Sequence, residues 1–134
     1  MADDRRVSTA GIALEAGKVF VALRKPGTTI GESWEFPGGK AEPGETPEET
    51  LMREYREEFS VSITVGSLLC EGSFQNGEKR YRLVGYQIFF NGGKPVLKEH
   101  SEQRWVDIKD LPTLPMAASD RQIAQCLMKK QDFK

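Results

Sequence analysis

The feature that most constrains the fold is the stretch from residue 38 to residue 61, which reads GGKAEPGETPEETLMREYREEFSV. Two glycines and a loop containing Pro and Gly precede a run that has no helix-breaking residue. Thr46 is suited to cap a helix N-terminus, Pro47 suits the first helical position, and Glu49 stands where a capping-box carboxylate belongs. The pattern therefore predicts an α-helix over residues 46–59.

The predicted helix carries three carboxylates on one face. Glu54, Glu57 and Glu58 are spaced i, i+3 and i+4, so their side chains share a narrow stripe. Like charges at these spacings each cost about 0.2–0.5 kcal/mol in an exposed helix. Arg53 and Arg56 should not relieve the repulsion, because each lies about 100° around the helix from the glutamate that follows it. The opposite face is apolar and is expected to form a buried stripe of Leu51, Met52, Tyr55 and Phe59.

Two interpretations of the acidic face remain open at this point. A Glu-rich helix face is most often solvated surface. Alternatively, a divalent cation binds there, since Mg²⁺ takes carboxylate oxygens and keeps coordination sites for water and substrate phosphates. The residues that precede the helix favour the second interpretation.

The whole stretch resembles the Nudix box, the signature of the Nudix hydrolases. In that pattern a Gly is followed at fixed spacing by Glu, Arg-Glu, Glu-Glu and a final aliphatic residue, and the chain keeps this register over residues 39–61. The chain departs from the box at Tyr55, where an aliphatic residue is usual, and at Ser60, where Gly is usual. Gly at that position usually provides a left-handed C-cap, so Ser60 should either adopt a costly positive φ or end the helix differently. The matching residues are Gly39, Glu45, Arg53, Glu54, Glu57, Glu58 and Val61.

Strand-like runs surround two predicted helices. The second helix is expected over residues 120–130, capped by Ser119 with Gln122 at the capping-box position. The pair Asn76-Gly77 between two apolar runs predicts a β-hairpin. This pattern indicates an α+β domain with the sheet between the helices, and the resemblance implies the Nudix α/β/α sandwich with a mixed β-sheet. Strands are expected over residues 6–14, 18–24, 34–37, 62–74, 80–90 and 103–108, with a polar loop over residues 26–32 and a Pro-broken linker over residues 111–115.

Composition limits the function classes. The 134 residues suffice for one domain with a core and are too few for two, so residues 1–134 are expected to form a single Nudix domain. A net charge of −1 does not favour a stable nucleic-acid complex or a charged membrane surface. No apolar run approaches a membrane span and the N-terminus lacks a signal-peptide core, so a cytoplasmic location is expected. Cys70 and Cys126 are expected to be buried free thiols rather than a zinc site or a disulfide.

The resemblance implies a metal site on the acidic face. Glu54, Glu57 and Glu58 are the expected ligands of Mg²⁺, with Mn²⁺ as an alternative ion. By the same resemblance the backbone carbonyl of Gly38 adds a ligand, because Gly lets the backbone come close. These residues are expected to act catalytically through the phosphate charge that the metal neutralises.

Four further charged residues are assigned around the box. Glu45 and Arg53 are expected to pair and to hold the loop against the helix, with Arg53 orienting the carboxylates. Glu99 lies in a polar loop at a spacing where a related enzyme carries a glutamate that serves as metal ligand or general base. Glu102 is the competing candidate for that role.

The segment WEFPGGK at residues 34–40 looks most like the MutT-type branch of the family. That branch hydrolyses nucleoside triphosphates, often damaged ones, to monophosphate and pyrophosphate. The expected substrates are therefore (deoxy)nucleoside triphosphates, such as 8-oxo-dGTP, CTP or dCTP. ADP-ribose or nucleotide-sugar hydrolysis, removal of pyrophosphate from RNA 5′ ends, and a non-catalytic binding module are the alternatives.

The remaining candidates concern substrate binding. Arg24, Lys40 and Arg80 are expected to contact the phosphates. Asp120, in the stretch before the last helix, is the one strongly polar candidate for contacting the base. A carboxylate accepts hydrogen bonds from a guanine amidine edge or a cytosine amino group. Alternatively, Asp120 is no more than an acidic residue favoured by the helix dipole.

Overall fold

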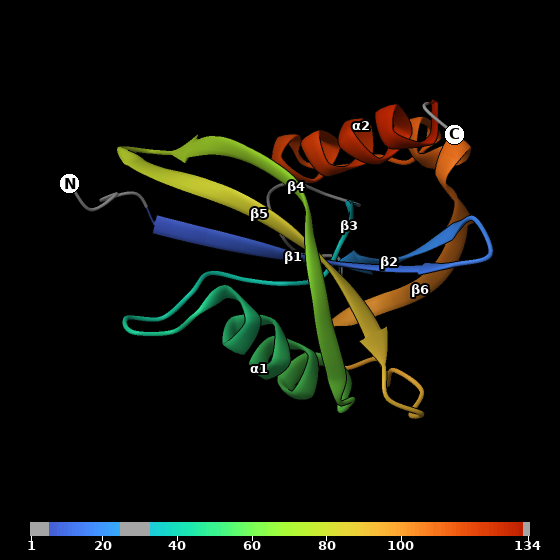
Figure 1. Ribbon diagram of the computed structural model, residues 1–134, viewed down its shortest axis with the longest axis horizontal. Helices are drawn as coiled ribbons and strands as arrows, with labels where there is room; N and C mark the ends of the chain where they lie inside the picture. The colour runs from blue at the N-terminus through green and yellow to red at the C-terminus, as the bar shows by residue number, and fades with distance from the viewer. Residues whose placement is uncertain (1–5, 25–32, 133–134) are drawn as a thin grey trace.

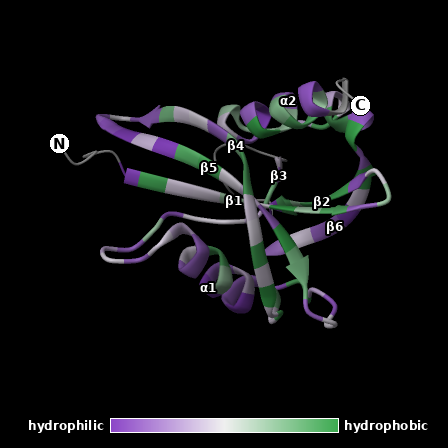
Figure 2. Cartoon of the chain, in the orientation of Figure 1, coloured by the Kyte–Doolittle hydropathy of each residue, from purple (hydrophilic) through white to green (hydrophobic). Residues whose placement is uncertain are grey.

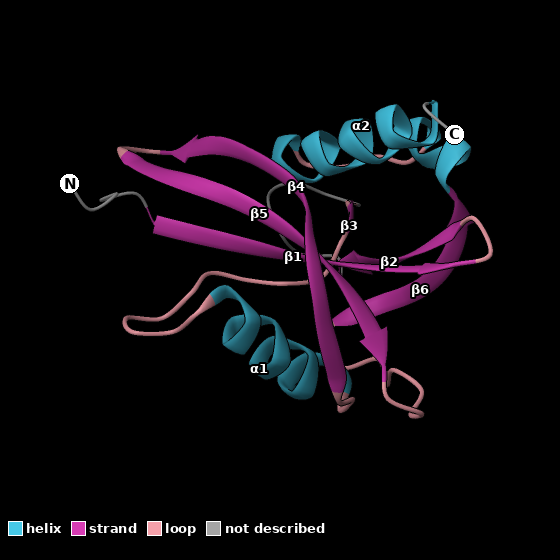
Figure 3. Cartoon of the chain, viewed as in Figure 1, coloured by secondary structure: helices cyan, strands magenta, loops and turns pink. Residues whose placement is uncertain are grey.

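The computed structural model describes residues 6–24 and 33–132, and Figures 1 and 3 show their arrangement. Most predicted elements are present close to the predicted bounds. The predicted loop at residues 26–32 lies outside the described residues. None of the helices within these two ranges has the length and apolar character needed to cross a membrane. In chain order the elements are β1 (Arg6–Glu15), β2 (Lys18–Arg24), β3 (Trp34–Glu35), α1 (Pro47–Phe59), β4 (Ile63–Asn76), β5 (Lys79–Phe90), β6 (His100–Asp107), the 3₁₀-helix η1 (Ile108–Thr113) and α2 (Ala118–Asp132).

The strands form one mixed sheet. Its order is β3-β2-β1-β5-β4, and β6 pairs with β2. β1 runs parallel to β5, whereas the other pairs are antiparallel. The β4–β5 hairpin turns at Gly77, whose φ is +64°, so the hairpin predicted from Asn76-Gly77 is confirmed.

The sheet opens between β1 and β2, and residues 37–41 fill the opening. β1 and β2 pair only at the two positions nearest the turn that joins them. Farther along β1, the N–H of Thr9 donates to the carbonyl of Gly39, and the N–H of Gly11 donates to the carbonyl of Pro37, both at 2.8 Å. The glycine loop that precedes α1 is thereby fixed against the centre of the sheet.

The two helices cover opposite faces of the sheet (Figure 1). Leu51, Tyr55 and Phe59 of α1 pack in one apolar core, and Ile123 and Leu127 of α2 pack in the other. Hydrophobic residues line β2, which contributes to both cores, whereas the tip of the β4–β5 hairpin is hydrophilic (Figure 2). This arrangement confirms the predicted α+β sandwich with a mixed sheet between helices.

Helix α1 begins as predicted, with Thr46 and Glu49 exchanging the two hydrogen bonds of a capping box. Ser60 ends the helix in the left-handed region, at φ +52° and ψ +39°, so it adopts the costly conformation usually left to Gly. The prediction that Met52 is buried is wrong, because it is 37% exposed. Leu51, Tyr55 and Phe59 lie along one line on the buried face of the helix. Met52 lies about 100° around the helix from Leu51.

A hydrogen bond of Tyr55 accounts for its presence where the box usually has an aliphatic residue. Its fully buried hydroxyl donates to the carbonyl of Pro37 at 3.0 Å, which ties α1 to the glycine loop. An added Cβ at Gly11 would lie 2.6 Å from that hydroxyl, so the strand leaves room for the ring. Burial raises the pKa of Tyr55 well above its usual value, and the hydroxyl therefore remains a donor.

The prediction of two free thiols is wrong, because Cys70 of β4 and Cys126 of α2 form a disulfide. Their Cα atoms lie 6.1 Å apart although 56 positions separate them in sequence. The packing of α2 against β4 brings them together, which sequence spacing does not reveal. Disulfides are rare in the cytosol, so a cytoplasmic location stays a prediction.

The start of α2 also differs from the prediction. The helix begins at Ala118, so Ser119 lies inside it and is not its N-cap. Gln122 does not complete a capping box, because its amide exchanges two hydrogen bonds with the backbone of Ser73 on β4, at 2.8 and 3.2 Å. The stretch predicted as a Pro-broken linker begins within η1, whose bounds include Leu111 and Pro112.

Candidate active site

The glycine loop brings α1 against β1. An added Cβ at Gly38 would lie 2.1 Å from the carbonyl oxygen of Thr9, and one at Gly39 would lie 2.7 Å from the carboxyl carbon of Glu54. The Thr9 hydroxyl donates to the carbonyl of Gly39 at 2.9 Å and accepts from its N–H at 3.1 Å. The backbone contact therefore requires Gly38, whereas a Cβ at Gly39 would displace the Glu54 side chain. The metal contact expected of the Gly38 carbonyl stays a prediction.

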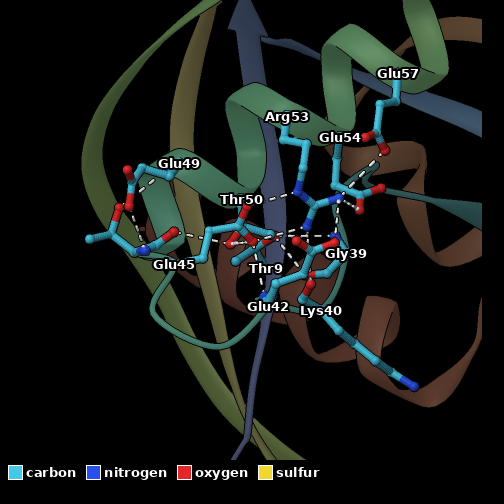
Figure 4. Close-up of polar contacts among 11 residues, drawn as sticks. Thr9, Gly39, Lys40, Glu42, Glu45, Glu49, Thr50, Arg53, Glu54 and Glu57 are labelled. Carbon is cyan, nitrogen blue, oxygen red and sulfur yellow. Dashed lines mark hydrogen bonds and ion pairs between the residues drawn. The ribbon is translucent and has the colours of Figure 1, made fainter.

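Arg53 is the centre of an ion-pair network (Figure 4). Its Nε and Nη2 donate to the two oxygens of Glu45 at 2.7 and 2.9 Å, so the predicted pair is confirmed. This bidentate contact lowers the pKa of Glu45 to about 2. Nη1 lies 2.7 Å from Oε1 of Glu54 and 3.4 Å from Oε2 of Glu57. The prediction that Arg53 leaves the glutamates unrelieved is wrong, because its long side chain reaches both of them.

Glu58 stands apart from this network. Its Oε2 is buried and has no hydrogen-bond partner among the described residues. Burial is the main cause that raises the pKa of Glu58 to about 8, followed by the carboxylates of Glu54, Glu35 and Glu99. A buried carboxylate without a donor is costly unless it is protonated or neutralised by a cation. Glu58 is therefore the group of the acidic face that most needs a cation.

The donor set fits a hard divalent cation. Glu54, Glu57 and Glu58 supply the carboxylate oxygens that Mg²⁺ prefers, and the unpartnered Oε2 of Glu58 is an acceptor that a cation would satisfy. Within residues 6–24 and 33–132, no three acidic, His or Cys side chains are gathered closely enough to form a ready-made metal site. Arg53 contacts one oxygen of Glu54 and one of Glu57. The second oxygen of each carboxylate could join Glu58 around an ion while the first keeps its contact with Arg53.

A cavity of about 300 Å³ lies beside Glu58. Ser119 and Asp120 of α2 line it as well, although α1 and α2 cover opposite faces of the sheet (Figure 1). The glycine loop, which fills the opening between β1 and β2, forms part of the wall, and Phe74 and Leu83 add apolar surface. One cavity therefore connects Glu58 with a partly apolar compartment that contains the carboxyl group of Asp120, whereas Glu54, Glu57 and Glu99 are not among its described lining residues.

Asp120 is held by one backbone hydrogen bond. Its Oδ1 accepts from the N–H of Phe36 at 3.0 Å. The pKa of Asp120 is raised to about 7, mainly by burial and further by the nearby carboxylate of Glu35. The hydrogen bond from Phe36 and the charge of Arg24 oppose this rise. Asp120 also lies in the first turn of α2, where a helix dipole favours an acidic residue. Near neutral pH the carboxyl group can either accept or donate a hydrogen bond to a ligand in the cavity.

Two of the three predicted phosphate contacts line the cavity. Arg24 does so while its Nε pairs with Glu35 at 2.8 Å. Lys40 also lines it, and its Nζ lies 4.9 Å from the ring centroid of Tyr81. Arg80 does not line the cavity, because it is exposed near the β4–β5 turn.

The two candidate loop glutamates lie in different surroundings. Glu99 is near enough to Glu58 to raise the pKa of its carboxyl group. Glu102 lies within β6, and its carboxylate pairs with Nε of Arg104. Position and charge therefore favour Glu99 over Glu102 as a contributor to the acidic face.

The sequence prediction missed Glu35 and His100. Glu35 lines the cavity, and its two oxygens lie 2.8 Å from Nε of Arg24 and 2.8 Å from Nε2 of His100. One signal was present: Glu35 is a single acidic residue between Trp34 and Phe36, which are both buried. A second signal is the position of the lone histidine, which directly follows the predicted loop glutamate.

The fold and the acidic helix after the glycine loop define a Nudix-type hydrolase site, and comparison with known proteins agrees. The Nudix domain family matches residues 4–127. An 8-oxo-dGTP diphosphatase of Haemophilus influenzae is 32% identical over 102 residues, which is 76% of this chain and 75% of the relative. A CTP pyrophosphohydrolase of Escherichia coli is 28% identical over 119 residues, which is 89% of this chain and 88% of the relative.

A solved structure shows the same fold. The solution structure of the E. coli ORF135 protein matches with a TM-score of 0.86 and 26% sequence identity, over 95% of this chain and 91% of that one. The chain belongs to the Nudix hydrolase family. Members of this family generally use divalent metal ions.

Proposed function

We propose that this protein hydrolyses (deoxy)nucleoside triphosphates to a nucleoside monophosphate and pyrophosphate, with Mg²⁺ as cofactor and Mn²⁺ as a substitute. The observation that carries the proposal is the single cavity lined by both Glu58 and Asp120. A triphosphate needs a cation site for its phosphates and a separate compartment for its base. The names of the two relatives, an 8-oxo-dGTP diphosphatase and a CTP pyrophosphohydrolase, support the same substrate class.

In this proposal the acidic face of α1 holds the metal. The ligands would be the carboxylates of Glu54, Glu57 and Glu58, the carbonyl of Gly38 and the carboxylate of Glu99. When bound, a divalent cation supplies positive charge that stabilises the negative charge developing on the phosphates. Positioning of the carboxylates, proton transfer and substrate binding are assigned to side chains of the protein.

Arg53 and the loop carboxylate have different roles. The bidentate contact with Glu45 fixes the guanidinium of Arg53, so Arg53 sets the position from which the helix carboxylates approach the phosphates. Glu99 is proposed as the general base that takes a proton from the attacking water, because it lies near Glu58 without an ion-pair partner among the described residues. Glu102 is less suited, since it is paired with Arg104.

The remaining wall of the cavity would hold the rest of the nucleotide. Arg24 and Lys40 supply positive charge for the phosphates. The carboxyl group of Asp120 would read the base, accepting from the donor edge of guanine or from the amino group of cytosine when it is ionised. Phe74 offers an aromatic face in the same compartment, and its ring already stacks on Tyr81 at 4.9 Å.

A nucleotide screen tests the proposal. The purified protein is incubated with Mg²⁺ and each of the natural dNTPs, 8-oxo-dGTP, CTP and ADP-ribose, and the products are separated and identified. We expect release of monophosphate and pyrophosphate from at least one triphosphate, and no release without a divalent ion. Turnover of ADP-ribose alone, release of inorganic phosphate instead of pyrophosphate, or no turnover at all would contradict the proposal.

A further inference from the structure

His100 is buried at the end of an exposed loop. It is 3% exposed, whereas Lys98, Glu99 and Ser101 beside it are all exposed. The pairing of β6 with β2 is irregular at this point, because Arg24 lies opposite His100 whereas the preceding residue of β2 lies opposite Glu102. Such an irregularity places one extra residue in a strand and re-aims the side chains around it. The strand therefore departs from regular pairing at the position where the imidazole is buried.

The imidazole contacts two elements that line or flank the candidate active site. Nε2 lies 2.8 Å from Oε2 of Glu35, whose other oxygen pairs with Arg24. The ring stacks on Phe59 at a centroid distance of 5.0 Å and an interplanar angle of 14°. Phe59 directly follows Glu58 in α1. His100, the residue after Glu99, thus packs directly on Phe59, the residue after Glu58.

The loop before His100 is attached to the same place. The N–H of Val96 donates to the carbonyl of Phe59 at 2.8 Å. The amide of Gln103 donates to the carbonyl of Pro95 at 3.2 Å, which closes the loop on β6. Glu99 therefore lies between two attachments of its loop to Phe59, one through the backbone of Val96 and one through the ring of His100.

The buried imidazole of His100 leaves one polar atom without a partner in the described part of the chain. Its Nδ1 is buried and has no hydrogen-bond partner within the described ranges. An unsatisfied buried polar atom is destabilising, and an apolar ring would stack on Phe59 without that cost. The contact that an apolar ring cannot replace is the one with Glu35.

We propose that His100 is a positioning residue, which sets the place of Glu99 relative to Glu58 by holding the loop against Phe59 and Glu35. This inference rests on the proposed function, because it assigns Glu99 to the metal site and to the reaction. His100 itself contacts neither substrate nor metal in this assignment. Its effect is transmitted through the backbone of the neighbouring glutamate.

Three variants separate the contributions of the ring and the hydrogen bond. His100→Phe keeps the stacking on Phe59 and loses the contact with Glu35. His100→Gln keeps a donor and loses the ring. Ser101→Ala changes an exposed neighbour and is the matched control. Each variant is compared with the wild type by Mn²⁺ binding, measured from the electron paramagnetic resonance signal of the free ion, and by the kcat and KM of the best triphosphate.

We expect His100→Phe to weaken Mn²⁺ binding and to lower kcat by about 10-fold or more, the usual effect of removing a group that orients a metal ligand. KM should remain close to wild type, His100→Gln should recover part of the loss, and Ser101→Ala should have no effect. Adding His100→Phe to Glu99→Gln should cause little further loss, because the glutamate that it positions is already altered.

Two results would overturn the inference. One is wild-type Mn²⁺ binding and kcat in both His100 variants. The other is an equal loss from His100→Phe in the wild-type and Glu99→Gln backgrounds, which would show that His100 acts independently of Glu99. Should His100→Phe fail to unfold cooperatively, His100→Gln in the same two backgrounds gives the decision. If the wild type hydrolyses no triphosphate, the proposed function fails, and the Mn²⁺ measurements still decide the role of His100.

Discussion

The two ends of the cavity are assembled in different ways. At the α1 end, the carboxylates of the acidic face and the arginine that orients them come from one helix and the loop directly before it. At the α2 end, Asp120 comes from α2, whereas Phe74 and Leu83 come from the β4–β5 hairpin, much earlier in the chain. The metal ligands proposed on α1 therefore follow local helical spacing. The position of Glu99 and the compartment proposed for the base depend instead on how distant segments pack against the sheet.

The electrostatics of the two ends also differ. Burial and neighbouring carboxylates raise the pKa of Glu58 to about 8, and no described residue donates to its Oε2. Burial raises the pKa of Asp120 to about 7, but the N–H of Phe36 partly offsets this effect. Oε2 of Glu58 is thus left for a proton or a cation to neutralise. Oδ1 of Asp120 already accepts from the N–H of Phe36, and its carboxyl group titrates near neutral pH.

Removing a carboxylate at the α1 end should have the largest effect. Glu58→Gln is expected to lower kcat by about 10³-fold or more, because it removes a metal ligand from the reacting centre. In contrast to its effect on kcat, the substitution should increase the stability of the metal-free protein above about pH 4.5. The folded-state pKa of about 8 lies above the usual 4.5, so ionisation of Glu58 destabilises the metal-free protein as pH rises from about 4.5 to 8.

Thermal unfolding in the absence of metal checks the predicted effect of Glu58→Gln on stability. Glu58→Gln should unfold at the same temperature as the wild type near pH 4.5, and at a higher temperature at pH 8, where the wild type has lost stability. Glu48→Gln, at an exposed position in the first turn of α1, is the control and should retain full turnover. A wild-type rate in Glu58→Gln would remove the metal assignment.

Reducing the disulfide should loosen the α2 end selectively. Cys70 and Cys126 close a loop across 56 positions, and such a link contributes about 2–4 kcal/mol to the free energy of unfolding. We expect reduction to lower that free energy by this amount. Amide hydrogen exchange should accelerate in α2 and change little in α1. Detection of two free thiols per chain in the unreduced protein, by a thiol reagent under denaturing conditions, would contradict the pairing.

Altering Asp120 should change the choice of base more than the rate. The informative quantity is the ratio of kcat/KM for two triphosphates that differ only in their base, because contributions from the metal end cancel in it. In the wild type this ratio should shift about 10-fold between pH 6 and pH 8, in favour of the base that presents donors as Asp120 ionises. In Asp120→Asn the ratio should be constant with pH. Parallel profiles in the two proteins would exclude Asp120 from base selection.

The smallest predicted effect concerns the end of α1. Ser60 has a φ of +52°, and replacing it by Gly should raise the free energy of unfolding by about 1 kcal/mol, because Gly adopts this conformation without strain. Ala16 has the same φ in the β1–β2 turn, so Ala16→Gly is a matched substitution away from the helix. Urea unfolding should show a similar gain for both and unchanged turnover. A loss of stability in Ser60→Gly alone would mean that the Ser60 side chain stabilises the helix end.

The α1 end could be predicted from the sequence because its signals are local. The capping box at Thr46 and Glu49 and the shared face of Glu54, Glu57 and Glu58 follow from helical spacing. Strand bounds also follow closely from apolar alternation. Even here, helical spacing did not predict that Arg53 contacts Glu54 and Glu57. The angle of a residue around the helix does not show how far a long side chain reaches.

The errors elsewhere concern contacts between distant segments. The disulfide, the exchange of hydrogen bonds between Gln122 and Ser73, and the contact between His100 and Glu35 join residues separated by 49 to 65 positions. A single sequence carries no periodicity that reports such pairs. Glu35 shows this most clearly, since an acidic residue in a two-residue strand becomes interpretable only once Arg24 and His100 are placed around it.

In the proposed complex, one nucleotide occupies the cavity from Glu58 of α1 to Asp120 of α2. A crystal structure of the wild type with Mg²⁺ and a non-hydrolysable nucleoside triphosphate analogue tests it directly. We expect the phosphates beside Glu54, Glu57 and Glu58, and the base within hydrogen-bonding distance of Asp120. A nucleotide whose base lies outside the cavity, with the Asp120 carboxyl group still bonded only to Phe36, would contradict the account.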